Sequence, residues 1–274
     1  MNASSSDRSI PLLRVLRRSR ENGGADCFFR GPFRIFADGK RMNEHPGLQA
    51  LLDELVSDAS CLDRQGELLQ KSPKARAWKV GEGRGCFFVK EYLEARGWSR
   101  IKDLARPSRA LRAWREARRW SSAGLSVPVP YLCVERCRPF PSRKSYFLSE
   151  YVEGATKFSS LWRELDEEGK NDLLRGAAAA IGRIHRAGGI HGDLKWNNIL
   201  VRGDETIFCD HDASRLHRRF DGRKAFKELQ RFLLDLRRKG GSDGQARLVL
   251  QCWQSALERL PDSLKSMIGG PDWN

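Results

Sequence analysis

Strand-like and helix-like sequence are segregated along this chain, and the segregation limits the folds that it can adopt. Short apolar runs separated by Ser, Pro and Gly fill the stretch LLQKSPKARAWKVGEGRGCFFVKEYL at 68–93, a pattern typical of an antiparallel meander. Strands are expected at 68–71, 77–80 and 86–92, and again from 145. Amphipathic helices are expected at 108–124, 164–186, 222–239 and 246–260. A sheet-rich first half and a helix-rich second half predict an α+β fold with two lobes.

The expected lobes divide the chain into three parts. Residues 1–25 are predicted to be a basic, flexible segment, residues 26–148 a small β-rich N-lobe, and residues 149–274 a shortened, mainly helical C-lobe. A chain of 274 residues is long enough for two packed lobes with their own cores. Composition shifts typical of loops occur near 20–26 and 38–47 and in the Pro-rich stretch 126–143.

Charge and cysteine usage restrict the partners and the compartment. Fifty Lys and Arg against 35 Asp and Glu give a formal net charge of +15, which favours phosphate-rich partners such as nucleic acid, anionic lipid or phosphorylated glycan. The seven cysteines are scattered without a CxxC pair, which indicates reduced thiols of a cytoplasmic protein rather than a zinc site. No apolar run approaches the ~18 residues that a membrane-spanning helix needs.

One stretch carries the chemistry, GGIHGDLKWNNILV at 188–201. It places Asp193 and Asn198 five residues apart, and Asp210 follows in TIFCDHD after two apolar residues that suggest a strand. Carboxylate and amide oxygens are the ligands that magnesium prefers, and phosphoryl transfer needs magnesium on the nucleotide phosphates. Each residue alone has an ordinary structural explanation as a cap, an ion pair or a turn residue. The order H-x-D-x-x-x-x-N, strand, Asp is that of the protein kinase catalytic loop.

HGDLKWNN together with FCDHD therefore resembles the protein-kinase-like superfamily, with glycine in place of the usual arginine. The resemblance implies ATP and Mg²⁺ as cofactors. It implies that Asp193 orients or deprotonates the acceptor hydroxyl and that Lys195 lies near the transferred phosphate. It further implies that Asn198 and Asp210 bind the metal, with Asp212 as a rival to Asp210.

The same resemblance requires a lysine for the nucleotide phosphates and a glutamate to hold it. Lys90, at the end of GCFFVK, resembles the lysine of the kinase V-A-I-K strand. Glu116 is the one acidic residue on the apolar face of the following helix and is the expected partner of Lys90. The alternative is that Glu116 pairs with Arg112 or Arg119 on its own helix.

Two further elements of nucleotide binding are expected around the meander. The GEGRG stretch lies too close to Lys90 to be a phosphate-covering loop, so the turn at 71–75 is the predicted cover, with Ser72, Lys74 and Arg76 rather than a glycine-rich motif. Glu150 and Val152 in SEYVEG lie in the expected lobe connector, where the main chain of kinases binds adenine.

The stretches RPSRALRAWREARRWSSAGLSVPVP, HGDLKWNNILV and CDHDASRL resemble the bacterial lipopolysaccharide kinase family, over roughly residues 60–240. This resemblance implies transfer of the ATP γ-phosphate to a heptose or Kdo hydroxyl of the lipopolysaccharide inner core. It implies a core glycolipid as partner and a peripheral position on the anionic cytoplasmic face of the inner membrane. Only 64 residues follow Asp210 and no A-P-E element is present, which argues against a peptide acceptor.

Two other kinase classes share H-G-D-x-x-x-x-N. An aminoglycoside- or choline-kinase-like enzyme acts on a cationic substrate, which the positive charge of this chain disfavours. An atypical kinase of the RIO or Bud type, acting on a protein or ribonucleoprotein, is basic as well and is the second hypothesis. The chain has no aromatic-interleaved RNA motif, so we expect no nucleic-acid partner, and the sequence does not indicate an oligomeric state.

Overall fold

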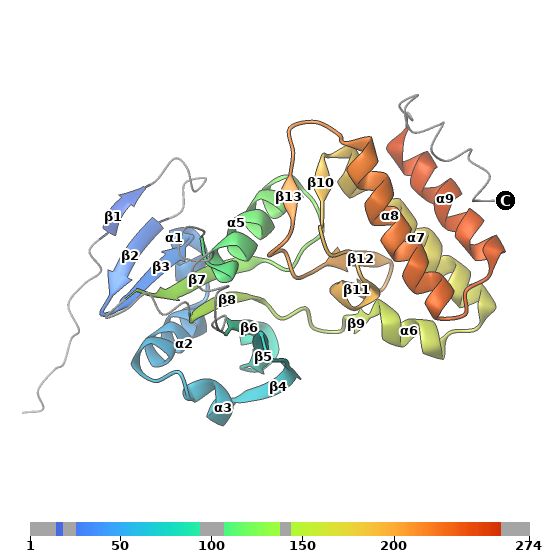
Figure 1. The fold of residues 1–274 in the computed structure, drawn as a ribbon. Helices are drawn as coiled ribbons and strands as arrows, with labels where there is room; N and C mark the ends of the chain where they lie inside the picture. Colours follow the sequence, from blue (N-terminus) through green and yellow to red (C-terminus); the bar gives the residue numbers. More distant parts are fainter. Residues whose placement is uncertain (1–14, 19–25, 94–106, 138–143, 259–274) are drawn as a thin grey trace, which may run out of the picture.

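The computed structural model describes residues 15–18, 26–93, 107–137 and 144–258, and Figure 1 shows them as two lobes. A large antiparallel sheet occupies the first lobe, and helices dominate the second. The predicted α+β class with a β-rich N-lobe and a helical C-lobe is therefore confirmed. The strands of the large sheet, in the spatial order β1-β2-β3-β7-β8-β6-β5-β4, are β1 (Val15–Arg18), β2 (Asp26–Arg30), β3 (Phe33–Ala37), β4 (Gly66–Lys71), β5 (Ala75–Val80), β6 (Phe87–Tyr92), β7 (Pro130–Arg136) and β8 (Ser145–Glu150).

Strand β6 positions the lysine that the sequence singles out. Side chains alternate between the two faces of a strand, so Val89 joins the core beneath helix α2 (Pro46–Ser57), whereas Lys90 points to the opposite face. That second face packs against α5 (Arg109–Ser122) through residues such as Tyr92 and Trp114. Lys90 therefore lies on the side of the sheet that carries α5.

The region expected as a loop at 38–47 is helical, which corrects the sequence-based prediction. Asp38 caps α1 (Gly39–Glu44) by accepting a hydrogen bond from the N–H of Lys40 at 3.2 Å, and Pro46 opens α2. The two helices together with α3 (Cys61–Gln65) connect β3 to β4. Asp and Pro are common in loops, but both are also typical of helix starts.

Part of the segment predicted to be flexible, Val15–Arg18, forms β1 and pairs with β2 at the edge of the sheet. The rest of that segment, 1–14 and 19–25, lies outside the described residues.

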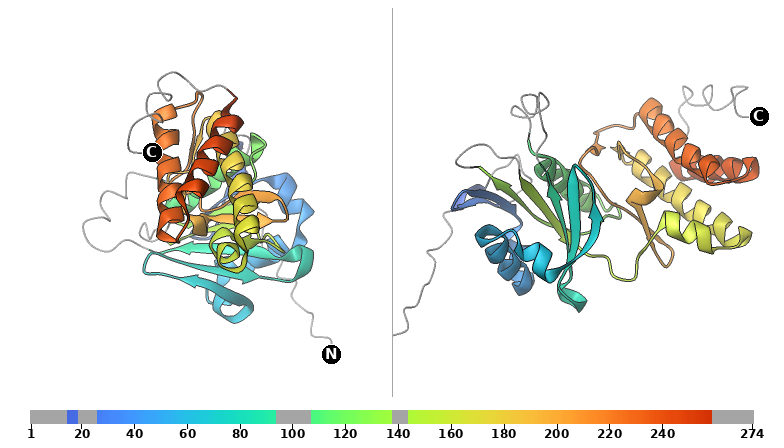
Figure 2. Two further views of the ribbon diagram at one scale, coloured as in Figure 1. Left: turned by 90° about the vertical axis from the view of Figure 1, so that its right-hand side faces the viewer. Right: turned by 60° about the horizontal axis from the view of Figure 1, so that its bottom comes forward.

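The second lobe contains four helices within its described part, and α7, α8 and α9 lie side by side in Figures 1 and 2. The expected helix at 164–186 is present as one helix that begins three residues later, because Asp166 accepts the N–H of Gly169 at 2.9 Å and caps it there. The helices are α6 (Phe158–Glu164), α7 (Glu167–Arg186), α8 (Gly222–Arg238) and α9 (Asp243–Leu257). No helix in the described ranges combines the length and apolarity required to cross a membrane.

Two small antiparallel sheets carry the functional segment between α7 and α8. Their strands are β9 (Thr156–Lys157), β11 (Ile199–Arg202) and β12 (Glu205–Phe208) in one, and β10 (Gly189–Ile190) and β13 (Arg215–Leu216) in the other. Trp196 packs between Phe158 and Phe232 in the core of the lobe, with ring centroids 4.7 and 5.7 Å away. The loop that contains Asp193 is thus fixed to the helical core by its own tryptophan.

Candidate active site

The loop after β10 folds around the carboxylate of Asp193. The Asn198 amide donates to the Asp193 carbonyl at 2.9 Å and to its carboxylate at 3.3 Å. The ammonium of Lys195 contacts the same carboxylate at 2.9 Å. The Asp193 side chain remains 32% exposed, so it is open to an acceptor. The structure therefore brings together three of the residues that the sequence singles out.

The β11–β12 hairpin brings Asp210 to the same place. Ile199 pairs with Phe208, and the N–H of Cys209 donates to the Asn198 carbonyl at 3.0 Å, so Asn198 and Asp210 lie at one end of the hairpin. Asp210 adopts φ 69°, in the left-handed region that residues other than glycine rarely occupy. Strained backbone of this kind persists where the surrounding structure holds it, often at functional sites.

Lys90 from the first lobe meets Asp210 from the second. The ammonium lies 2.6 Å from the carboxylate, and the Lys90 side chain is 13% exposed. Burial alone would raise the pKa of Asp210, but the charge and hydrogen bond of Lys90 outweigh it and the pKa is lowered. The carboxylate is therefore ionised at neutral pH. Lys90 contacts Asp210, Asn198 contacts Asp193, and the backbone hydrogen bond from Cys209 to Asn198 brings the two pairs to the same end of the hairpin.

The expected ion pair between Lys90 and Glu116 is not formed among the described residues. Glu116 instead pairs with Arg119 at 3.0 Å, the alternative on its own helix, and accepts the N–H of Leu216 at 3.1 Å. Arg119 donates to the Leu216 carbonyl at 2.8 Å. Glu116 is buried as predicted, but it faces β13 rather than β6, which corrects its expected role as the partner of Lys90.

Asp212 is held by a different cation. Nε and Nη2 of Arg109 lie 2.7 and 2.6 Å from one Asp212 oxygen. Asp212 was the rival to Asp210 as a metal ligand, and the two carboxylates are thus distinguished by their partners. Asp210 faces Lys90 of β6, whereas Asp212 faces Arg109, the first residue of α5.

The lobe connector follows β8. The side chain of Glu150 accepts the N–H of Val129 at 3.2 Å, and its own N–H donates to the Val129 carbonyl at 2.8 Å. Val152 is 7% exposed. Glu150 thus fixes the end of the strand, and a main-chain contact of Glu150 and Val152 with adenine stays a prediction.

The hairpin between β4 and β5 is a tight turn, as expected for the predicted phosphate cover. The Ser72 hydroxyl accepts the N–H of Ala75 at 3.0 Å, and Arg76 pairs with buried Glu91 at 2.7 Å. Lys74 is exposed and forms no ion pair within the described chain, whereas Arg76 is held by Glu91, and the role of this turn as a phosphate cover stays a prediction.

One buried carboxylate was missed at the sequence level. Glu228 accepts the N–H groups of His191 and Gly192 at 2.9 and 2.6 Å, and Nε2 of His185 lies 3.1 Å from it. Nδ1 of His185 accepts from Trp253 Nε1 at 2.9 Å, so Nε2 carries the proton and donates to Glu228. Burial raises the pKa of Glu228, but these partners outweigh it and the pKa is lowered. Glu228 therefore fixes the two residues that precede Asp193.

His211, between the two aspartates, is fully buried and neutral. Burial, with a smaller contribution from nearby His191, lowers the pKa of His211 to about 3, and its ring nitrogens lie 2.9 Å from the Phe208 carbonyl and 3.1 Å from the Ser214 hydroxyl. The neutral His211 side chain thus anchors the backbone of residues 210–212 through these two contacts.

Because the unfolded chain protonates His211 near pH 6.5 and the folded protein does not, folding is destabilised as pH falls below 6.5. We expect the free energy of unfolding to drop by about 1.4 kcal/mol per pH unit from this group. Urea denaturation at pH values from about 7.5 to about 5 measures how the free energy of unfolding changes with pH. The substitution His211→Gln should reduce this slope by the contribution of one proton taken up on unfolding. The same substitution at half-buried His217 is the control, and an unchanged slope in His211→Gln would contradict the assignment.

The residues at the hairpin end fit a nucleotide-bound magnesium ion. Mg²⁺ is held in such sites by one or two protein oxygen ligands, with phosphates and water completing an octahedron. Asp210 and Asn198 supply this donor set, and the described residues contain no larger cluster of His, Cys, Asp and Glu that could hold a metal. When bound, the ion would neutralise charge on the transferred phosphate.

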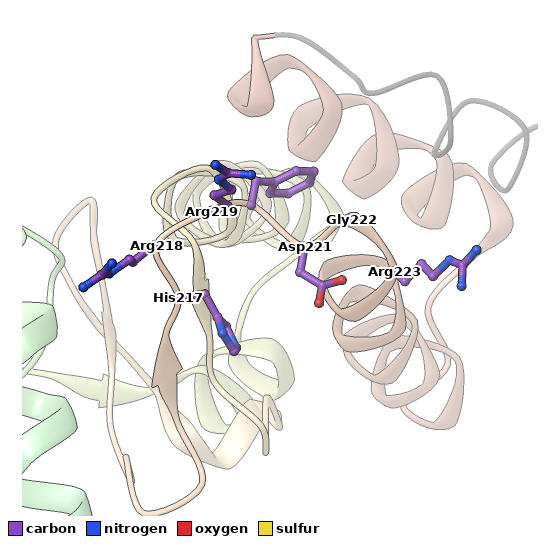
Figure 3. Close-up of a pocket in the computed structure, with 7 residues that line it drawn as sticks. His217, Arg218, Arg219, Asp221, Gly222 and Arg223 are labelled. Carbon is purple, nitrogen blue, oxygen red and sulfur yellow. The ribbon is translucent and has the colours of Figure 1, made fainter.

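A cavity of about 500 Å³ lies beyond the site, between β13 and α8 (Figure 3). It is lined by residues 217–223, and Arg218, Arg219 and Arg223 point in different directions in Figure 3. Asp221 caps α8 by accepting the N–H of Lys224 at 3.1 Å. The loop therefore adds positive charge after the Asp210 segment without gathering its guanidinium groups around one point.

A β-rich lobe whose strand lysine faces an Asp-Asn-Asp set on the helical lobe defines the chain as protein-kinase-like. The pattern of the "Lipopolysaccharide kinase (Kdo/WaaP) family" matches residues 65–253, and the chain belongs to this family. A solved structure of WaaP in complex with acyl carrier protein matches with a TM-score of 0.53 and 21% identity, over 76% of this chain and 84% of that one. At this identity the likeness concerns the fold.

Two archaeal proteins are also similar in sequence. A probable bifunctional tRNA threonylcarbamoyladenosine biosynthesis protein of Methanothermobacter thermautotrophicus is 32% identical over 152 residues, 54% of this chain and 26% of that protein. The KEOPS complex subunit Bud32 of Pyrococcus abyssi is 29% identical over 125 residues, 44% of this chain and 52% of the subunit. The chain thus matches about a quarter of the first relative and about half of the second.

Proposed function

We propose that the protein is an ATP-dependent phosphotransferase that phosphorylates a heptose or Kdo hydroxyl of the lipopolysaccharide inner core. The proposal is carried by two contacts, Lys90 with Asp210 and Asn198 with Asp193, which the backbone hydrogen bond from Cys209 to Asn198 holds at one end of the hairpin. Membership of the lipopolysaccharide kinase family supports the sugar acceptor.

Each residue has a distinct role in the proposal. Lys90 leaves Asp210 to bind nucleotide phosphate, while Asp210 and Asn198 hold Mg²⁺. Asp193 accepts the proton of the acceptor hydroxyl or orients that hydroxyl toward the γ-phosphate. Lys195, 2.9 Å from Asp193, offsets charge on the transferred group.

The surroundings of Asp193 suit an anionic acceptor. Arg231 lies 3.6 Å from the Asp193 carboxylate, and the side chains of Arg231 and Lys195 are 51% and 55% exposed. The net charge of +15 favours the same kind of substrate. A core glycolipid that carries phosphates and carboxylates meets this requirement, and the proposal therefore includes a peripheral position at the anionic cytoplasmic face of the inner membrane.

A second candidate function comes from the archaeal relatives. The 32% identity with the Methanothermobacter protein and the match to Bud32 favour an atypical kinase that acts on a protein or ribonucleoprotein. The absence of an A-P-E element and the basic side chains beside Asp193 favour the glycolipid.

Phosphate transfer from radiolabelled ATP distinguishes the two. We expect label in dephosphorylated inner-core lipopolysaccharide, and no label above background in RNA, an aminoglycoside or an archaeal-type protein acceptor. The aminoglycoside lacks anionic groups, and RNA, which combines ribose hydroxyls with phosphates, tests whether negative charge beside a sugar hydroxyl is sufficient. Asp210→Ala is the blank. Label confined to a protein acceptor supports the second function, and equal label with the blank overturns both.

A further inference from the structure

Helix α5 is connected to the segment 210–216 at two points. The first is the pair of Arg109 and Asp212, with two guanidinium nitrogens at 2.7 and 2.6 Å from the carboxylate. At the other end of the helix, Glu116 and Arg119 bond the N–H and the carbonyl of Leu216 at 3.1 and 2.8 Å. In protein kinases the corresponding helix is connected to the site by a lysine–glutamate pair, which this structure does not form.

The pair of Arg109 and Asp212 adjoins the pair of Lys90 and Asp210 across one aromatic ring. The Arg109 guanidinium and the Lys90 ammonium lie 4.8 and 5.1 Å from the ring centroid of Tyr92. Tyr92 is 1% exposed, so a rigid buried ring supports both cations. Cations over an aromatic face are stabilised by the ring quadrupole, more so where they are partly desolvated.

The two ion pairs differ in what happens when nucleotide binds. In the proposed function, Lys90 must exchange Asp210 for phosphate oxygen, so Asp210 loses the partner that holds it at 2.6 Å. Its backbone is then still in the unfavourable region at φ 69° and is held by the contacts of the next two residues, those of His211 and of Asp212. Asp212 is only two residues away and keeps Arg109, which contacts no other acidic group in the described chain.

We propose that Arg109 is a positioning residue that holds the metal-binding Asp210 in place through Asp212, so that α5 is connected to the site without the lysine–glutamate pair of protein kinases. The inference rests on the proposed function for the identity of the ligand, MgATP. The α5 helix thereby acts on the metal ligand rather than on the phosphate lysine. Residues that orient a metal ligand without binding the metal themselves typically contribute about 10–100-fold to metal affinity or activity.

The test uses Arg109→Ala, Asp212→Asn and the double variant. Arg112→Ala, on the same helix, is the matched control because it removes the same charge and has no acidic partner among the described residues. The first readout is the Mg²⁺ concentration required for half-maximal binding of a fluorescent ATP analogue. The second is amide hydrogen exchange of residues 210–216 in the protein without nucleotide.

We expect Arg109→Ala to raise the required Mg²⁺ concentration by about 10–100-fold and to speed exchange at 210–216, with Arg112→Ala unchanged. The double variant should be no worse than either single one, because both remove the same interaction. Effects of the two substitutions that multiply, or exchange unchanged in Arg109→Ala, overturn the proposal. Failure of the unsubstituted protein to bind the ATP analogue instead contradicts the proposed function, while the exchange result still tests the contact.

Discussion

Substitution of Asp193 by asparagine is expected to lower kcat for phosphate transfer by about 10²–10⁴-fold, the usual contribution of a positioned acid or base. Asparagine keeps the size of the side chain and can still contact Asn198, which donates to it at 3.3 Å. It lacks the negative charge that accepts a proton from the acceptor. Because Asp193 has no proposed contact with nucleotide, affinity for ATP should change by less than about threefold, a small fraction of the catalytic loss.

Single-turnover phosphate transfer and ATP-analogue binding measure the two quantities separately. Asp204→Asn is the matched control, since it removes the same charge from the turn between β11 and β12, away from the Asp193 carboxylate. Thermal unfolding of both variants excludes a general loss of structure. If Asp193→Asn retained full turnover with a normal ATP affinity, the assignment of the acceptor site would be wrong.

Local sequence patterns predicted the elements that surround the site. Turn residues between short apolar runs gave the strands β4, β5 and β6, and helical periodicity gave α5, α8 and α9 to within a few residues. The hairpin pair β2–β3 was not predicted, although two apolar runs joined by Gly31 and Pro32 are a local hairpin pattern. Its place in the sheet depends on pairing of Phe33 with Arg136, which no local pattern encodes. Helix α2 could have been found from Leu48, Leu51, Leu52 and Leu55, which recur at helical spacing.

The site residues likewise include some that local sequence patterns predict and others whose contacts depend on the tertiary structure. Asp193 and Asn198 lie within one loop, so their contact at 3.3 Å follows from spacing and motif order. Lys90 and Asp210 are 120 residues apart, and only the resemblance to kinases related them. For Glu116, periodicity correctly predicted a buried face but not which segment that face meets. That choice depends on how α5 is rotated against β13 and β6, which is a tertiary property.

The burial of Glu228 could have been predicted from the sequence. It is a single carboxylate in the apolar stripe of α8, with Ala225 three residues before it and Phe232 four residues after it. A buried carboxylate is costly unless hydrogen bonds and charge compensate it. A lone acidic residue on a core face therefore predicts a specific partner, here the backbone that leads into the Asp193 loop.

Removal of the Glu228 carboxylate is expected to give the second large effect. Glu228→Ala leaves the N–H groups of His191 and Gly192 and the ring of His185 without their acceptor in a buried site. Each unsatisfied buried group costs about 1–3 kcal/mol, so we expect the free energy of unfolding to fall by about 3–5 kcal/mol. Urea denaturation measures this loss, and Ala in place of exposed Glu164 at the end of α6 is the control.

Glu228→Gln separates folding from positioning. An amide offers one acceptor oxygen to two N–H groups and presents its own N–H₂ to the other, so the loop of Asp193 should shift even where the protein remains folded. Turnover should then fall by about 10–100-fold with a smaller change in ATP affinity. Because the pKa of Glu228 is lowered in the folded protein, its contribution is present above pH 4.5 and is lost as pH falls through the folded value. The stability difference between Glu228→Gln and the unsubstituted protein should therefore narrow in acid, and a difference that is constant with pH would show that the carboxylate charge is not what anchors the loop.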